Sequence, residues 1–179
     1  KKSYPEIKIK IRNNTTPEVI DDLNGGKTDI AFITNPFSVS EKLTSRNMTE
    51  FHEILVGGST YAELAESRKT LKELCSYPLI GLGNGTATYE LYKAVFSEAK
   101  IDYELDMEVA TANLMLPLIQ NDLGIGFVPE VLAEPLLEKK ELVQIDVDMK
   151  MPPRDIQMVW DKGVGKSWAA ELFIKYLEK

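Results

Sequence analysis

Residues 110–129 read ATANLMLPLIQNDLGIGFVP, and this stretch decides the fold of the chain. Thr111 and Asn113 stand just before apolar residues at helical spacing, so a helix is predicted to begin there with a polar cap. Gly124 then ends the helix, and residues 125–128 form a short apolar run that is typical of a strand buried in a parallel sheet. Open α/β sheets often bind small molecules where a helix starts beside a buried strand, so the stretch predicts a ligand-binding protein.

The composition limits the classes of function. The chain has 179 residues, 44% of them hydrophobic, which is enough for one sizeable core or two small ones. Lys and Arg number 21 against 28 Asp and Glu, so the net charge of -7 is expected to repel nucleic acid. No apolar run approaches the roughly 20 residues that span a bilayer, so no membrane partner is predicted. The single cysteine, Cys75, cannot form an intrachain disulfide, which makes a cytoplasmic location the simpler prediction.

The first quarter of the chain predicts a strand, a helix and a second strand. Residues 6–12 alternate between charged residues and Ile, which predicts a strand with one apolar face. Residues 13–26 carry polar cap residues, a proline at the first helical position and a closing glycine pair, which predict a helix. Residues 28–33 are nearly all apolar and predict the next strand. The order strand, helix, strand predicts that the two strands pair in parallel through a right-handed crossover.

Helices and strands continue to alternate through the rest of the chain. Residues 38–47 are polar and predict a loop, and residues 48–56 predict a strand that crosses to a second lobe. A second polar helix start follows the strand at residues 78–82, with Thr86 or Thr88 as its cap. The other predicted helices are residues 62–75, 129–140 and 168–176, and the other predicted strands are residues 104–109, 142–147 and 156–160.

Several motifs, in this order and spacing, resemble the effector-binding domain of LysR-type transcriptional regulators. They are Tyr4-Pro5, the run GKTDIAFI at residues 26–33, CSYPLI at residues 75–80, LIQNDLGIGFVP at residues 118–129 and IQMVW at residues 156–160. The resemblance covers essentially the whole chain, and residues 118–129 are its most specific part. Ser59-Thr60-Tyr61-Ala62 departs from the family's usual His-Pro-Leu-Ala after the crossover strand.

The resemblance implies an α/β fold of two lobes, similar to type 2 periplasmic binding proteins, with two crossing strands as a hinge. Lobe I is expected at residues 1–49 and 153–179, and lobe II at residues 50–152. The first strand and helix of the family's lobe I are not found in this sequence. The family's N-terminal helix-turn-helix, which binds DNA, is not found either, so we expect contact with DNA only through that missing domain.

The resemblance also implies an effector site in the cleft between the lobes. The expected effector-binding residues lie in four places along the chain. Thr34, Asn35 and Pro36 follow the strand at residues 28–33, and Gly85, Thr86, Ala87 and Thr88 form the second-lobe loop. Thr111, Ala112 and Asn113 begin the helix within residues 110–129, and Phe127 lies in the strand that follows it. Hydroxyls, an amide and two helix starts together favour a small carboxylate or another small anion. The competing interpretation is that the threonines only cap helices.

Three classes of function follow. The first is the effector-binding domain of a regulator, which the resemblance further implies to be a homodimer and, in the full-length protein, possibly a tetramer. The alternative is an extracytoplasmic solute-binding protein of a transport system. An enzyme is disfavoured, because no nucleophile and base or pair of catalytic carboxylates can be placed in the cleft. No metal or cofactor is expected either, since His52 is the only histidine and has no cysteine beside it.

Overall fold

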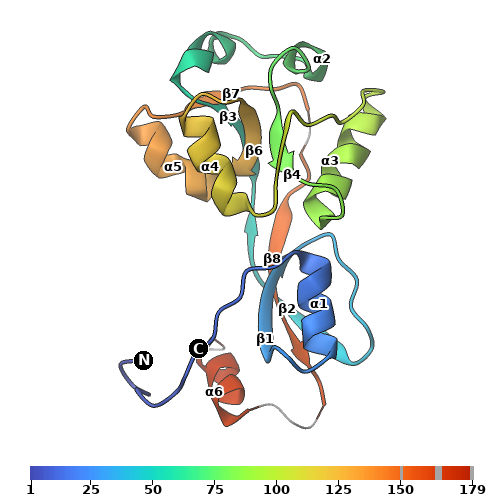
Figure 1. Cartoon of the computed structure of the whole chain (residues 1–179), viewed down its shortest axis with the longest axis vertical. Coiled ribbons are helices and arrows are strands. Elements are labelled where there is room, and N and C mark those ends of the chain that lie inside the picture. The colour runs from blue at the N-terminus through green and yellow to red at the C-terminus, as the bar shows by residue number, and fades with distance from the viewer. Residues whose placement is uncertain (150, 164–166, 178–179) are drawn as a thin grey trace.

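The computed structural model describes residues 1–149, 151–163 and 167–177 of the chain. Two α/β lobes lie one above the other along the long axis of the molecule (Figure 1). The chain crosses between them where β2 is followed by β3 and again at the start of β8. The predicted two-lobed α/β fold is thereby confirmed. The exact division after residues 49 and 152 stays a prediction.

The lower lobe in Figure 1 is built on three antiparallel strands in the order β1-β8-β2. Along β1, Ala31 and Ile33 face the core and Phe32 faces outward, because successive side chains of a strand alternate between its faces. Leu23 of the neighbouring helix packs against this inner face. The elements are α1 (Thr16–Asn24), β1 (Ile30–Thr34), β2 (Leu43–Phe51), β8 (Arg154–Asp161) and α6 (Trp168–Leu177).

The upper lobe contains two small sheets. One has the antiparallel order β6-β3-β7, and the other pairs β4 and β5 in parallel. Its strands are β3 (Glu53–Gly57), β4 (Ile80–Leu82), β5 (Met107–Val109), β6 (Ile125–Pro129) and β7 (Val143–Ile145). Its helices are η1 (Ser59–Glu66), α2 (Leu71–Leu74), α3 (Ala87–Glu98), α4 (Ala112–Gln120) and α5 (Glu130–Glu138).

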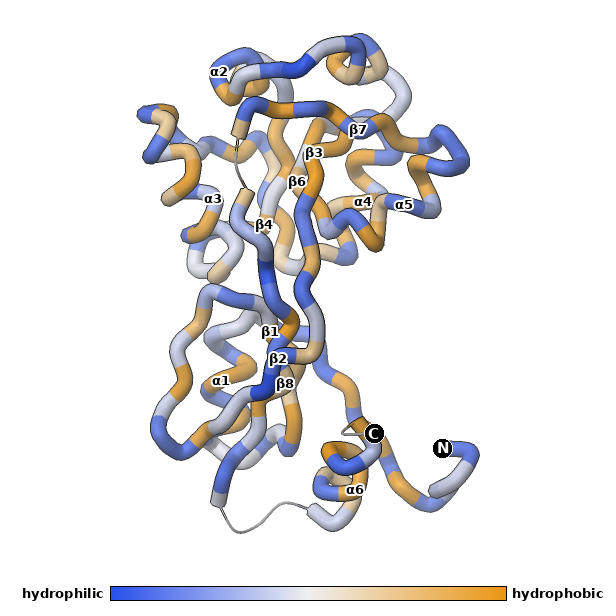
Figure 2. Tube along the Cα trace, turned by 180° about the vertical axis from the view of Figure 1, so that it is seen from behind, coloured by the Kyte–Doolittle hydropathy of each residue, from blue (hydrophilic) through white to orange (hydrophobic). Residues whose placement is uncertain are grey.

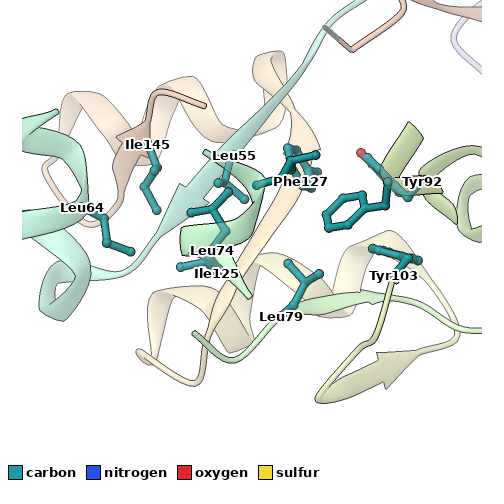
Figure 3. Close-up of a cluster of buried hydrophobic side chains, with 11 residues drawn as sticks. Leu55, Leu64, Leu74, Leu79, Tyr92, Tyr103, Ile125, Phe127 and Ile145 are labelled. Atoms are coloured by element: carbon teal, nitrogen blue, oxygen red, sulfur yellow. The ribbon is translucent and has the colours of Figure 1, made fainter. Parts of the chain in front are cut away.

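The main hydrophobic core lies in the upper lobe. Hydrophobic residues concentrate along β3 and β6, where the tube in Figure 2 is orange. Leu55, Ile125 and Phe127 of these strands are almost completely buried and pack with Leu79, Tyr92 and Tyr103 (Figure 3). The aromatic end of this core faces the junction between the lobes, where the candidate site lies.

The strand predicted at residues 6–12 is wrong, and so is its parallel pairing with residues 28–33. Ile9 and Ile11 are 65% and 88% exposed, and in the described part of the chain this segment pairs with no strand. Alternation predicts which face of a strand would be apolar, but a strand also needs a neighbour for its backbone hydrogen bonds. In the sheet, β1 instead pairs with β8, which comes from the far end of the sequence.

Three other predictions need correction. Residues 125–128 are buried as predicted, but β6 pairs antiparallel with β3 and meets Leu79 only in an isolated parallel bridge. The loop predicted at residues 38–47 is partly strand, because β2 begins at Leu43. The helix predicted at residues 62–75 is divided into η1 and α2, since Thr70 and Glu73 form a capping box that starts a new helix.

Candidate functional site

A cavity of about 120 Å³ lies where the crossing strands enter the upper lobe. Its polar residues come from both lobes and from both crossings: Thr34, Glu53, Thr88 and Arg154. Aliphatic and aromatic side chains of the upper lobe form most of the remaining wall: Ile80, Leu82, Tyr92, Tyr103, Met115 and Phe127. The cavity therefore has a polar end at the hinge and an apolar body inside the upper lobe.

Arg154, the first residue of β8, is the centre of the polar end. Its side chain is only 3% exposed, and its Nη1 donates to Oε1 of Glu53 at 2.9 Å. Glu53, the first residue of β3, is 5% exposed. The guanidinium also lies over the ring of Phe51 at 5.5 Å from the centroid. A buried charge is tolerated only when it is paired and hydrogen-bonded. Glu53 and Arg154 therefore stabilise each other at the crossing.

The same guanidinium joins residues of the two lobes. Nη2 of Arg154 donates to Thr34 Oγ1 at 2.8 Å in the lower lobe and to Thr88 Oγ1 at 3.1 Å in the upper lobe. Nε and Nη2 also donate to the backbone oxygen of Asn35 at 3.1 and 2.9 Å. The amide of Asp155 donates to Asn35 Oδ1 at 2.7 Å, which fixes the loop after β1 against the start of β8. One side chain thus links the end of β1 with the start of α3.

The hydroxyls of Thr34 and Thr88 are arranged to donate. Each accepts a hydrogen bond from Arg154, and no described residue receives the proton of either hydroxyl. A hydroxyl that accepts from a cation still has its own proton to donate, so both can bind an acceptor oxygen in the cavity. Thr88 is the second residue of α3 and Ala112 the first of α4, so two helix N-termini with partial positive charge also border the cavity.

Tyr92 completes the polar network around Glu53. Its hydroxyl donates to Oε2 of Glu53. Burial, reinforced by the Glu53 carboxylate, raises the pKa of Tyr92 well above its ordinary value. Burial and the same carboxylate also raise the pKa of Tyr103. Both phenols therefore stay neutral at physiological pH, and Tyr92 remains a donor to Glu53.

The structure brings four of the residues expected from the sequence into this cavity. Thr34, Thr88, Ala112 and Phe127 line it. Asn35 does not line it but holds Arg154 through its backbone oxygen. Four others line a second, more open hollow of about 390 Å³ between α1 and the start of α3: Pro36, Gly85, Thr86 and Ala87.

Thr86, one of these four residues, also caps α3, whereas the last two expected residues, Thr111 and Asn113, line neither hollow. The hydroxyl of Thr86 donates to the Gly83 oxygen at 3.0 Å and accepts from the Tyr89 amide at 3.1 Å, so it is fully used as the cap of α3. Thr111 is the N-cap residue of α4 but makes no side-chain cap hydrogen bond. Asn113 is exposed, and neither it nor Thr111 lines either hollow.

Glu53, Tyr92 and Arg154 were not expected from the sequence. Their contacts join residues that are 39 to 120 positions apart, and no local motif reports such a distance. One signal was present in the sequence: Glu53 is a charged residue directly before an apolar run that starts at Ile54. Among the residues that the structure describes, no cluster of three His, Cys, Asp or Glu side chains could hold a metal ion. In the same residues no helix is long and apolar enough to cross a membrane.

Comparison with known protein families gives one match over the whole chain. A family model described as the LysR substrate binding domain matches residues 1–179. A curated relative is the uncharacterized HTH-type transcriptional regulator YeiE of Escherichia coli K12, which is 22% identical over 157 residues. That match covers 88% of this chain and 52% of YeiE, so the chain spans about half the length of the relative.

Two solved structures share the fold. The effector binding domain of QuiR in complex with shikimate has a TM-score of 0.78 at 18% identity, and the match covers 98% of this chain and 82% of that one. The regulatory domain of CcmR from Synechocystis PCC6803 in complex with 2-PG has a TM-score of 0.79 at 16% identity, with coverages of 98% and 84%. At these identities the likeness shows the fold alone.

Proposed function

The chain belongs to the LysR substrate-binding domain family, and from this premise we propose that it is the sensor of a transcription regulator that binds a small anionic metabolite. The effector occupies the cavity between the lobes. Its binding changes how a helix-turn-helix domain outside these 179 residues engages DNA. Such coupling requires that the effector binds one arrangement of the regulator more tightly than another.

One observation carries the choice of site: Thr34 and Thr88, from different lobes, meet at one nitrogen of Arg154. Their free hydroxyl protons and the starts of α3 and α4 supply donors to an anion, while Glu53 balances the charge of Arg154. An acceptor bound between these hydroxyls would contact both lobes at once. Closure of the lobes would then add contacts that only the bound state makes.

The similar structures support an anion. Shikimate, which the QuiR domain holds, is a carboxylate, and another structure of this fold, the HypT regulatory domain from Salmonella typhimurium, is described with a bound bromide ion. These ligands belong to those proteins. Together with the donors of Thr34 and Thr88, they support the proposal of an anion for this chain.

Calorimetric titration of the purified chain with a panel of small metabolites tests the proposal. We expect an anionic metabolite to bind, and Thr34→Val and Thr88→Val each to weaken it about tenfold or more, because a hydrogen bond to a charged group contributes about 1.5–3 kcal/mol. Thr44→Val, on β2 and outside the cavity, is the matched control and should leave the affinity unchanged. Binding of neutral or cationic compounds only would contradict an anionic effector.

The comparisons favour a regulator over a transport binding protein, since the curated relatives are transcription regulators. We infer the corresponding properties from this role: a cytoplasmic location, binding without catalysis, no cofactor, and contact with DNA only through the other domain. Fluorescence anisotropy with labelled duplex DNA checks the last point. The acidic chain alone should not bind a duplex at physiological salt.

We infer further that the chain forms a symmetric homodimer, which would associate into tetramers in the full-length regulator. Large apolar side chains are exposed on both lobes: Phe32, Trp168 and Phe173 on the lower lobe, and Val131 and Leu132 on the upper lobe. Exposed apolar patches are typical of interaction surfaces. Analytical ultracentrifugation of the chain at several concentrations tests this, and a monomer at every concentration would contradict it.

A further inference from the structure

We propose that two copies of this chain join by strand addition: an arm of each copy, residues 7–12, pairs with the free edge of β1 in the other copy. The inference rests on the proposed function, because it assigns a surface to the homodimer inferred there. It follows from an extended segment that has no strand partner, from an uncovered edge of a sheet and from the opposite charges of the two.

The arm is an extended segment that is already held at both ends. Tyr4 contacts Trp168 of α6 with ring centroids 5.9 Å apart, and Arg12 bonds Asp22 of α1 at 3.2 Å. Between these contacts, residues 8–11 make no backbone–backbone hydrogen bond to any described residue. In both Figure 1 and Figure 2 the segment leaves the lower lobe and its far end lies beside α6. A segment that is held in this way loses little further freedom when it binds.

β1 offers the edge to which such a segment can add. The sheet order β1-β8-β2 places β1 at the end of the lower-lobe sheet, so alternate backbone groups of β1 point away from β8. Within the described residues, no backbone group outside β8 bonds to residues 30–34. Phe32, at the centre of the strand, is 50% exposed. An exposed edge of this kind is a template for a strand of another chain.

The sequence of the arm suits an added edge strand. Its isoleucines lie on one face and its basic residues on the other, because side chains alternate along a strand. Ile9 and Ile11 are 65% and 88% exposed in the single chain. Beside β1 these side chains can continue the buried row of Ala31 and Ile33, and the basic residues then face outward on the side of Phe32. Lysines are common on the edge strands of natural sheets.

The charges of the two surfaces are opposite. Residues 16–34, which contain α1 and β1, hold four carboxylates and one lysine. Asp21 and Asp29 are exposed there, and neither forms an ion pair with a described residue. In the arm, Lys8 and Lys10 are exposed and are equally without an ion pair among the described residues. A second copy brings both a basic arm and an acidic α1 and β1, so the two contacts can form together in a closed two-fold pair.

Analytical ultracentrifugation and hydrogen exchange of the full chain at matched concentrations test the site. We expect a dimer to form as the concentration rises, with slower exchange of backbone amides in both the arm and β1. Ile11→Glu should weaken the dimer about tenfold or more, and it should leave the far-UV circular dichroism unchanged because the side chain is exposed. Leu114→Glu makes the same change of charge at an exposed residue of α4 in the other lobe and should leave the affinity unchanged.

Charge reversal tests whether the arm of one copy meets α1 and β1 of another. One chain carries Lys8→Glu and Lys10→Glu, and a second chain carries Asp21→Lys and Asp29→Lys. Each variant alone places like charges at both contacts, so its dimer should be weakened about tenfold or more. An equal mixture places opposite charges at both contacts, so it should dimerise about as tightly as the parent chain.

The outcomes separate this inference from the inferred homodimer. A parent dimer that Ile11→Glu and both reversed chains leave unchanged keeps the homodimer and overturns strand addition. Reversed chains that dissociate but do not pair when mixed overturn it too. Slow exchange of the arm at every concentration assigns the arm to β1 of its own copy, which also overturns it. A parent chain that stays a monomer overturns both inferences, whereas effector binding depends only on the metabolite titration.

Discussion

Among single side chains, Glu53 and Arg154 are expected to couple most strongly. Glu53→Gln leaves the guanidinium buried without its counter-charge, and removal of one partner of a buried pair costs about 3–5 kcal/mol. Arg154→Met leaves the carboxylate in the same position. We expect each single variant to lower the free energy of unfolding by about this amount in urea at pH 7. The double variant should lose much less than the sum, because neither charge is then left alone.

A salt bridge with an exposed lysine provides the control for this cycle. Lys42 lies 2.9 Å from Asp161 but is 53% exposed, so Lys42→Met should cost less than about 1 kcal/mol. Additive effects of the two buried substitutions would show that Glu53 and Arg154 contribute to stability independently of each other.

The sequence could predict some of these side chains but not their network. The end of an apolar strand and the start of a helix are local features, and they led to the prediction of Thr34 and Thr88, which both line the cavity. Arg154 follows two prolines and stood outside the strand predicted at residues 156–160. Its burial depends on acceptors 66 to 120 positions away, so only the folded chain reveals it.

Among the secondary-structure elements, the contact between β4 and β6 depends on Gly124. A Cβ at this position would lie 2.5 Å from the backbone oxygen of Pro78, which cannot move without disturbing the strand. Gly124→Ala should therefore lower the free energy of unfolding by about 1–3 kcal/mol. At Gly83 the added Cβ would meet the mobile carboxylate of Glu108 at 2.8 Å. Gly83→Ala is the control in thermal unfolding, and an equal loss in both variants would refute the argument from close approach.

The capping box of α2 should make stability depend on pH. The amide and the hydroxyl of Thr70 both donate to the Glu73 carboxylate. These hydrogen bonds, that of the amide most strongly, lower the pKa of Glu73 below its ordinary value. Because the pKa is lower in the folded state, the ionised box stabilises the fold above the ordinary glutamate pKa. The stabilisation is lost as the pH falls through the lowered value.

Urea unfolding of the parent chain and of Glu73→Gln between pH 7 and pH 3 measures this effect. The parent should be the more stable at pH 7, and the difference should vanish at the acid end. Glu66→Gln removes one exposed negative charge nearby and controls for net charge. A difference that stays constant over the whole range would contradict an ionised cap.

Local signals succeeded where an element has its own start and stop. Thr86 was one of two predicted caps, and α3 begins directly after it. The sequence at Thr70 to Glu73 carried the signature of a capping box, which would have divided the helix predicted at residues 62–75. The predicted strand pairing was wrong, because the partners of β1 and β6 lie far away in the sequence. Alternation of polar and apolar residues specifies which face of a strand is buried, but it does not specify the neighbouring strand.

At the level of the whole molecule, the two lobes are joined by the crossing strands and by the hydrogen bonds of Arg154. The backbone crosses between Phe51 and Glu53 and returns at Arg154. The guanidinium of Arg154 adds hydrogen bonds from this crossing to Thr34 below and Thr88 above. The arrangement of the lobes should therefore respond to this one side chain, even though each lobe has its own core.

Arg154→Lys tests the connection between the lobes. A lysine keeps the charge, but its ammonium has three donors on one atom and cannot reach Glu53, Asn35, Thr34 and Thr88 together as the planar guanidinium does. We expect a larger radius of gyration in small-angle X-ray scattering and a weaker affinity for the effector, with the far-UV circular dichroism retained. Arg68→Lys, at a residue that is 60% exposed and lies outside both hollows, is the matched control. If both variants scatter like the parent chain, the relation of the lobes is set by the crossing backbone alone, and Arg154 serves the cavity without joining the lobes.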